Sequence, residues 1–194
     1  QVSWLINEGL NYLTSGKVPG RLGNAHPNIV PYQSFATQDG NMVLAIGNDN
    51  QWLKFCQQAK LTTLAQNVQY CSNEQRVLNR AKLVPIIAQR LAEHSTQWWL
   101  EQLEQVAIPC GSVNTLAQVF NHPQIKHRHM VTQVSDKNGV KINTIASPIK
   151  LSATPLQYNS AAPDLGQHST EILSNTLNYS ATKINELINS GVIE

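Results

Sequence analysis

Three histidines that lie close together in the sequence are the residues most suggestive of metal chemistry. His122, His127 and His129 form the pattern HxxxxHxH. A structural zinc site needs four ligands, and a catalytic zinc site usually has three protein ligands in fixed geometry. Lys126 and Arg128 alternate with these histidines, and their positive charge disfavours a bound cation. We therefore expect a solvated polar loop here and no metal site.

The cysteine and aspartate residues give little indication of a catalytic nucleophile. Cys110 lies in an apolar run, where a thiol is more often a small core residue than a nucleophile. The GxSxG sequence of the serine hydrolases is absent. The aspartates fall at expected turns or helix caps, where short carboxylates serve the backbone; they are Asp39, Asp49, Asp136 and Asp164. These residues by themselves predict no catalytic group.

One loop has a composition that suits the close approach of a ligand. It runs Gly23-Asn24-Ala25-His26-Pro27 and carries few bulky side chains. Gly23 permits close backbone approach, and Pro27 favours an extended conformation at His26. The alternative interpretation is a turn between domains, and the loop alone does not decide between the two.

Helices and hairpins, not regular βαβ units, must position these residues. Strand-like runs at 32–37 and 42–46 flank Asp39-Gly40, and runs at 130–134 and 140–145 flank Asn138-Gly139, so both pairs predict β-hairpins. A buried strand is expected at 106–113. Ser72 is expected to cap a long helix that Pro85 kinks or breaks. The predicted fold class is α+β.

The composition limits the classes of function. The 194 residues are 41% hydrophobic, which is enough for one good core or two small ones. A net charge of +2 excludes a polybasic nucleic-acid binder. No apolar run reaches the roughly 18 residues of a membrane span, so no membrane partner is expected. Cys56, Cys71 and Cys110 are widely spaced and odd in number, which predicts reduced thiols in a cytoplasmic protein.

The first residues fit an amphipathic helix. Its apolar positions recur at helical spacing and are Val2, Leu5, Ile6, Gly9, Leu10 and Leu13. The apolar face of such a helix normally packs against another element. We therefore expect these residues to belong to a longer polypeptide, with a flexible N-terminal arm as the alternative.

The segment from Arg21 to Gln33, RLGNAHPNIVPYQ, resembles the class III CoA-transferases. That group includes formyl-CoA transferase, carnitine CoA-transferase and the bile-acid-inducible F proteins. The similarity continues in order to the end of the His168 motif, through segments at 45–52, 79–80, 108–114, 122–130, 148–152 and 165–169. Many separate motifs at family-like spacing make a chance match improbable.

The resemblance implies a division of the chain and an assembly. Residues 1–31 would be the end of a large Rossmann-like domain and a linker. Residues 32–147 would form a small α+β domain, and residues 148–194 would be a return linker with C-terminal helices of the large domain. The family also implies a homodimer in which two subunits thread through each other as interlocked rings.

The resemblance implies a chemistry that starts outside these residues. In the family, an aspartate attacks an acyl-CoA thioester, and an aspartyl-CoA thioester then passes CoA to an acceptor acid. That aspartate is expected upstream of Gln1, so no catalytic residue is expected within the chain. Coenzyme A would be a substrate, and no bound cofactor is expected.

By the same resemblance, the family's glycine-rich loop over the active site corresponds to Gly23, Asn24, Ala25, His26 and Pro27. Formyl-CoA transferase has a run of glycines there and this chain has one, so we expect another pair of substrates, small carboxylic or dicarboxylic acids. His26 and Gln33 are candidates to bind the acceptor carboxylate; the alternative for His26 is a plain turn residue. An α-methylacyl-CoA racemase of the same fold and a non-catalytic binding module are the alternative functions.

Overall fold

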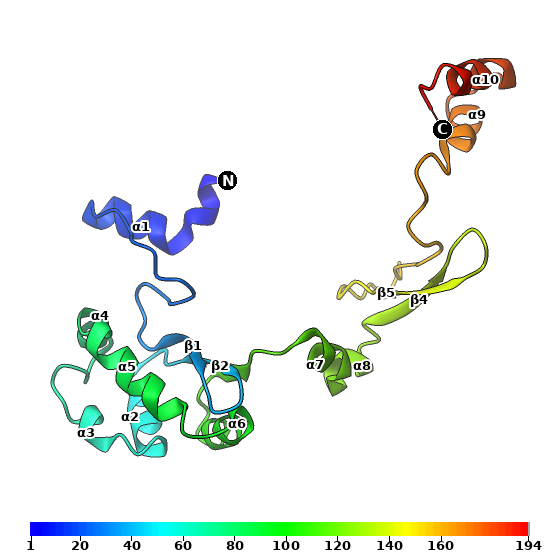
Figure 1. Ribbon diagram of the computed structural model, residues 1–194. Helices are drawn as coiled ribbons and strands as arrows, with labels where there is room; N and C mark the ends of the chain where they lie inside the picture. Colours follow the sequence, from blue (N-terminus) through cyan, green and yellow to red (C-terminus); the bar gives the residue numbers. More distant parts are fainter. Residues whose placement is uncertain (194) are drawn as a thin grey trace. The chain divides into compact units, whose positions relative to one another are not determined.

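A computed structural model describes residues 1–193 of the chain. The chain divides into two compact units, Gln1–Val113 and Asn114–Glu194, and each is described by itself (Figure 1). Within residues 1–193, no helix is both long enough and apolar enough to pass through a bilayer.

The first unit opens with a short 3-10 turn, η1 (Val2–Leu5), followed by helix α1 (Ile6–Ser15). Gly16 ends α1 in the left-handed conformation, with φ of 69°, and donates its N–H to the Tyr12 carbonyl. The predicted amphipathic helix is therefore present. None of its residues is buried, and Leu5, Ile6 and Leu10 are more than half exposed.

A three-stranded antiparallel sheet lies at the centre of this unit. Its order is β1 (Tyr32–Ala36), β2 (Asn41–Ala45), β3 (Cys110–Ser112). The β1–β2 pair confirms the hairpin predicted around Asp39-Gly40. The predicted strand over 106–113 is wrong in length. Ala107 adopts a positive φ of 56° and Ile108 N–H bonds back to the Leu103 carbonyl, so residues 106–108 end the preceding helix.

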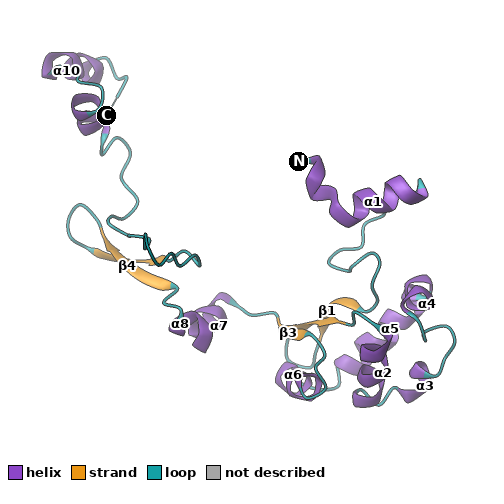
Figure 2. Ribbon diagram, turned by 180° about the vertical axis from the view of Figure 1, so that it is seen from behind, coloured by secondary structure: helices purple, strands orange, loops and turns teal. Residues whose placement is uncertain are grey.

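Five further helices belong to this unit: α2 (Asp49–Gln58), α3 (Thr62–Ala65), α4 (Asn73–Leu78), α5 (Arg80–Leu91) and α6 (Thr96–Glu104). Figure 2 shows α2, α5 and α6 beside the strands. The core comes from alternate residues of β2 and the inner faces of these helices. Its largest fully buried apolar side chains are Trp52, Trp99, Phe55, Met42, Leu44, Ile46, Leu83, Ile87, Leu91 and Leu103.

The helix expected after Ser72 is broken, but not at Pro85. Ser72 caps α4 as predicted, since its hydroxyl accepts from Gln75 N–H. The break falls at Asn79, whose side-chain amide donates to the carbonyls of Gln75 and Gln69. Pro85 lies exposed inside α5.

The second unit has fewer regular elements. Helices α7 (Leu116–Asn121) and α8 (Pro123–His127) precede a hairpin of β4 (Val131–Ser135) and β5 (Lys141–Ile145). Gly139, at φ 80°, completes the turn predicted at Asn138-Gly139. Helices α9 (Ser169–Asn175) and α10 (Ala181–Asn189) follow, and the Ser180 side chain caps α10.

Mixed helices and small antiparallel sheets confirm the α+β class. The predicted boundaries at residues 31 and 147 separate the parts of the chain that would belong to the large and the small domain of a longer protein. The boundary between the two compact units, after Val113, is a different division and does not test those two boundaries. The three-part division stays a prediction.

Candidate functional site

The loop from Gly23 to Pro27 is held against strand β1 by side-chain contacts. Gly23 turns the chain at φ 62°, and the space beside its Cα is open. The Asn24 side chain donates from Nδ2 to Ser34 Oγ at 2.6 Å and accepts the Ser34 N–H at 3.0 Å. Ala25 N–H bonds to the Leu22 carbonyl. The loop is therefore a tight structure with an open face at Gly23.

His26 is fixed from several directions. The His26 ring stacks on the Tyr32 ring with centroids 5.3 Å apart. The backbone N–H of His26 donates to the Tyr32 carbonyl at 2.9 Å. Nδ1 accepts the N–H of Asn28 at 3.1 Å. A neutral imidazole has one acceptor nitrogen, so Nδ1 as the acceptor goes with the tautomer that carries its proton on Nε2. The side-chain nitrogen Nδ2 of Asn7, in α1, lies 3.2 Å from Nε2, and the Asn7 amide has to be turned for its oxygen to accept from that proton.

A row of side chains on α4 and α5 binds the backbone that follows. Arg80 Nη2 donates to the carbonyls of both His26 and Pro27 at 2.7 Å. Asn73 donates to the Asn28 carbonyl at 2.8 Å and accepts the Val30 N–H at 3.1 Å.

Arg76 continues this row inside the core. Its side chain is fully buried and donates from Nε to the Val30 carbonyl at 2.7 Å. It also donates to the Tyr70 carbonyl and pairs with Asp49 at 2.8 Å. These contacts were not predicted, although the spacing 73, 76 and 80 was a possible signal: one helical face carrying three donors.

Gln33 lies on β1, opposite Leu44 of β2, and is partly buried. Side chains alternate along a strand, so Gln33 points to the face opposite that of Tyr32 and Ser34. Those two residues contact His26 and Asn24. The structure therefore brings His26 together with Asn24, Asn7 and Arg80, and it places Gln33 on the other face. The joint binding role of His26 and Gln33 stays a prediction.

Each aspartate has a structural partner. Asp39 accepts the N–H of Thr96 at 2.7 Å and its hydroxyl at 3.0 Å, and these hydrogen bonds lower the pKa of the Asp39 carboxyl. Asp49 was expected as a turn or cap residue, yet Asn48 caps α2 and Asp49 pairs with Arg76. Asp136 accepts two loop N–H groups, and Asp164 pairs with Lys137.

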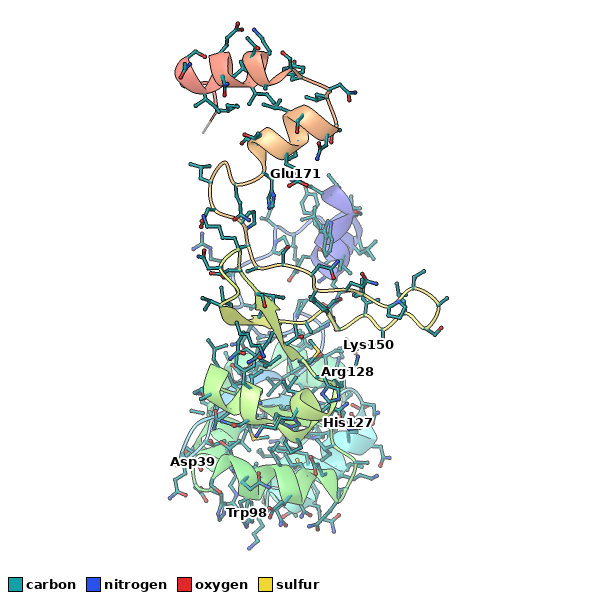
Figure 3. The ribbon with its side chains drawn as sticks, turned by 90° about the vertical axis from the view of Figure 1, so that its right-hand side faces the viewer. Asp39, Trp98, His127, Arg128, Lys150 and Glu171 are labelled. Atoms are coloured by element: carbon teal, nitrogen blue, oxygen red, sulfur yellow. The ribbon has the colours of Figure 1, made fainter. Side chains whose placement is uncertain are left out.

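The histidine pattern at 122–129 forms the ends of short helices. His122 caps α8, since its Nδ1 accepts the Gln124 N–H at 3.1 Å. Arg128, labelled in Figure 3, donates to the Pro148 carbonyl at 2.8 Å and ties the chain after β5 to α8. Across residues 1–193, no three His, Cys, Asp or Glu side chains gather closely enough to hold a metal ion.

The cysteines differ in burial. Cys56 is fully buried, and burial raises the pKa of its thiol to about 12. Cys110 is half-buried; burial, then the charge of Glu104, raises its thiol pKa. Thiols with raised pKa are poor nucleophiles at neutral pH, which agrees with the packing role expected for Cys110. Cys71 is exposed.

Sequence and structure comparisons identify the family. The model of CoA-transferase family III matches residues 1–169. The chain is 35% identical over 174 residues to succinate–glutarate CoA-transferase of Agrobacterium fabrum, which covers 90% of this chain and 44% of that protein. It is 36% identical over 194 residues to human succinyl-CoA:glutarate CoA-transferase, covering 100% of this chain and 44% of the relative. The chain belongs to CoA-transferase family III, as its motifs predicted.

The fold has the same relatives. A CAIB/BAIF family protein from Brucella suis, solved by crystallography, matches with a TM-score of 0.70 and 37% identity. The match covers 89% of this chain and 44% of that one. The chain thus spans less than half the length of the relatives that it matches.

Proposed function

We propose that these residues form part of a CoA-transferase that moves CoA from succinyl-CoA, or a similar acyl-CoA, to a small dicarboxylic acid. One observation carries this proposal. Two relatives that match along almost the whole chain, at 35% and 36% identity, are named for succinate or succinyl-CoA and glutarate. More distant matches include succinyl-CoA:mesaconate CoA-transferase of Haloarcula marismortui, at 34% identity, whose named acceptor also has two carboxyl groups.

The loop from Gly23 to Pro27 is the proposed contact with the acceptor. A dicarboxylate needs hydrogen-bond donors for the carboxylate that does not react. His26 with its proton on Nε2 supplies such a donor, and the Asn7 amide lies 3.2 Å from that nitrogen. The open face at Gly23 lets a ligand approach the backbone.

The proposed reaction passes through covalent intermediates on an aspartate and consumes no water. An aspartate carboxylate attacks the donor thioester, and the C–S bond breaks to give an anhydride and CoA thiolate. The thiolate attacks the aspartyl carbonyl, which releases the donor acid and forms an aspartyl-CoA thioester. The acceptor carboxylate attacks this thioester, the C–S bond breaks to free the thiolate, and a mixed anhydride of aspartate and acceptor forms. The thiolate then attacks the acceptor carbonyl, giving the new acyl-CoA and the original aspartate.

The nucleophilic aspartate is proposed to lie outside these residues. Asp39 and Asp49 are held by Thr96 and Arg76, and Asp136 and Asp164 serve a turn and an ion pair. Each contact engages one carboxylate oxygen in a turn, a loop contact or an ion pair, and this favours a structural role for these four aspartates.

Several further properties belong to this proposal. The names of the matched relatives favour transfer over racemisation or a non-catalytic role. The three free cysteines favour a cytoplasmic location. An interlocked homodimer, with residues 1–31 and 148–194 in the large domain, would cover the exposed apolar face of α1.

The test is an assay of the protein made from the complete reading frame that contains these residues. Succinyl-CoA and glutarate are incubated with it, and we expect glutaryl-CoA by mass spectrometry. A parallel reaction in D₂O with a 2-methylacyl-CoA measures α-proton exchange. Exchange without any dicarboxylyl-CoA product would overturn transfer and support the racemase. The 194-residue chain alone should give no product, and turnover by it would contradict the placement of the nucleophile.

A further inference from the structure

The row Asn73, Arg76 and Arg80 makes a clamp on the backbone of the candidate loop. Together the three side chains bind five backbone groups between residues 26 and 30. These are the carbonyls of His26, Pro27, Asn28 and Val30 and the N–H of Val30. Successive peptide groups held in this way leave the loop little freedom to open as a flap.

We propose that Arg80 is a positioning residue, which holds His26 so that its Nε2–H edge is set for the acceptor acid. This inference rests on the function proposed above for the loop. Arg80 acts through the backbone: it binds the carbonyls of His26 and Pro27, one on each side of the Pro27 ring, both at 2.7 Å.

The position of the His26 backbone sets the position of its ring. With the His26 carbonyl held by Arg80, the ring stacks on Tyr32 and its Nδ1 accepts the Asn28 N–H. Rotation about the side-chain bonds would lose both contacts, so these contacts hold the Nε2 edge of the ring in one orientation.

Arg80 also carries a cost that stability alone does not explain. Its Nη1 is buried and has no hydrogen-bond partner among the described residues, while Nη2 binds both carbonyls. An unpartnered buried donor is destabilising. A side chain that served stability alone would do better without an unpartnered Nη1. This favours a role for Arg80 in positioning the backbone at His26.

The experiment compares Arg80→Met with Arg90→Met. Arg90 is a matched control because it lies on the same helix and donates to a backbone carbonyl, that of Ala59, at 2.7 Å. Hydrogen exchange of the 194-residue chain is measured at the amides of His26 and Asn28, with urea unfolding beside it. We expect exchange there to rise about tenfold in Arg80→Met relative to Arg90→Met, and Arg80→Lys to restore part of the protection. Equal exchange in the two Met variants would overturn the proposal.

Kinetics of the complete protein separate the clamp from the function. With Arg80→Met, the KM for the acceptor acid should rise roughly tenfold while the KM for the acyl-CoA donor is unchanged. Arg90→Met should leave both constants unchanged. Faster hydrogen exchange at His26 with an unchanged KM for the acceptor acid would show that Arg80 only holds the loop backbone. That result would overturn the positioning role of Arg80 and the acceptor-binding role proposed for the loop.

Discussion

Arg76 is a buried cation whose partners come from three separate segments. Its guanidinium binds the carbonyls of Val30 and Tyr70 and the carboxylate of Asp49, and it lies over the Trp52 ring at 5.2 Å. Arg76→Met should lower the free energy of unfolding by about 2 to 4 kcal/mol, because it leaves buried carbonyls without donors. Urea unfolding followed by circular dichroism measures the change.

The matched control for this prediction is Asp49→Asn. The Asp49 side chain is half exposed, and an amide oxygen can still accept from Arg76. The loss should therefore stay below about 1 kcal/mol. If the two variants were equally destabilised, the ion pair and not the backbone contacts would be the stabilising interaction.

Asp39 predicts a dependence of stability on pH. Hydrogen bonds from the Thr96 N–H and hydroxyl lower its pKa below the ordinary value of 3.8. A lowered native pKa means that ionised Asp39 stabilises the fold above pH 3.8, and that this stability is lost as pH falls through the native pKa. Wild type should therefore exceed Asp39→Asn in stability at pH 6, and the difference should shrink toward pH 3.

Urea midpoints of both proteins between pH 3 and pH 7 measure this difference. Thr96→Val, which removes the hydroxyl but keeps the backbone N–H, should show part of the same pH dependence. A constant gap between wild type and Asp39→Asn across the range would contradict a carboxylate role for Asp39.

At the scale of elements, α1 presents an apolar face that nothing covers within the described residues. Leu5 and Leu10 are 57% and 64% exposed, and Asn7 and Asn11 on the other side bind His26 and Asn28. The double variant Leu5→Gln and Leu10→Gln should change the free energy of unfolding by no more than about 0.5 kcal/mol. It should also lower apolar-dye fluorescence and self-association of the 194-residue chain.

Leu83→Ala, on α5, is the contrasting variant in a buried position. Leu83 is fully buried, so its truncation should cost about 2 to 5 kcal/mol. Dye fluorescence and sedimentation velocity are compared at equal concentration. Unchanged dye binding in the double glutamine variant would show that the exposed surface lies elsewhere.

Local signals in the sequence predicted the elements that local forces make. Asp39-Gly40 and Asn138-Gly139 each marked a hairpin, and Ser72 marked a helix start. The failures came where contacts beyond the local turn and cap signals decide where an element ends. Strand β3 is short because residues 106–108 fold back on α6, and the break at Asn79 depends on a bond to the Gln69 carbonyl.

The candidate site was predictable only in part for the same reason. The loop at 23–27 was found through its resemblance to a family, and its composition alone left a plain turn open. The clamp was not predicted, because Arg80 reaches His26 across 54 positions and Arg76 reaches Val30 across 46. An arginine on a helix is most often solvated, and no periodicity distinguishes one that binds a loop.

At the scale of the whole molecule, the apolar core is confined to the first unit. The main cluster runs from Val30 to Ile108, and every member lies before residue 114. In the second unit the buried apolar residues are Val134, Ala146 and Ile184. Cooperative unfolding depends on a contiguous core, so the two units should differ in stability.

Residues 1–113 should therefore fold alone, and residues 114–194 should not unfold cooperatively. We expect the fragment 1–113 to unfold in urea in a single sharp transition, with a midpoint within about 0.5 M of the matching transition in the 194-residue chain. The fragment 114–194 should show a broad, shallow change, because three isolated buried side chains cannot offset the entropy of ordering it. Circular dichroism follows both fragments, and tryptophan fluorescence follows the fragment 1–113, where Trp52 and Trp99 report on the core. A sharp transition in the fragment 114–194 would contradict the assignment of the core to the first unit alone.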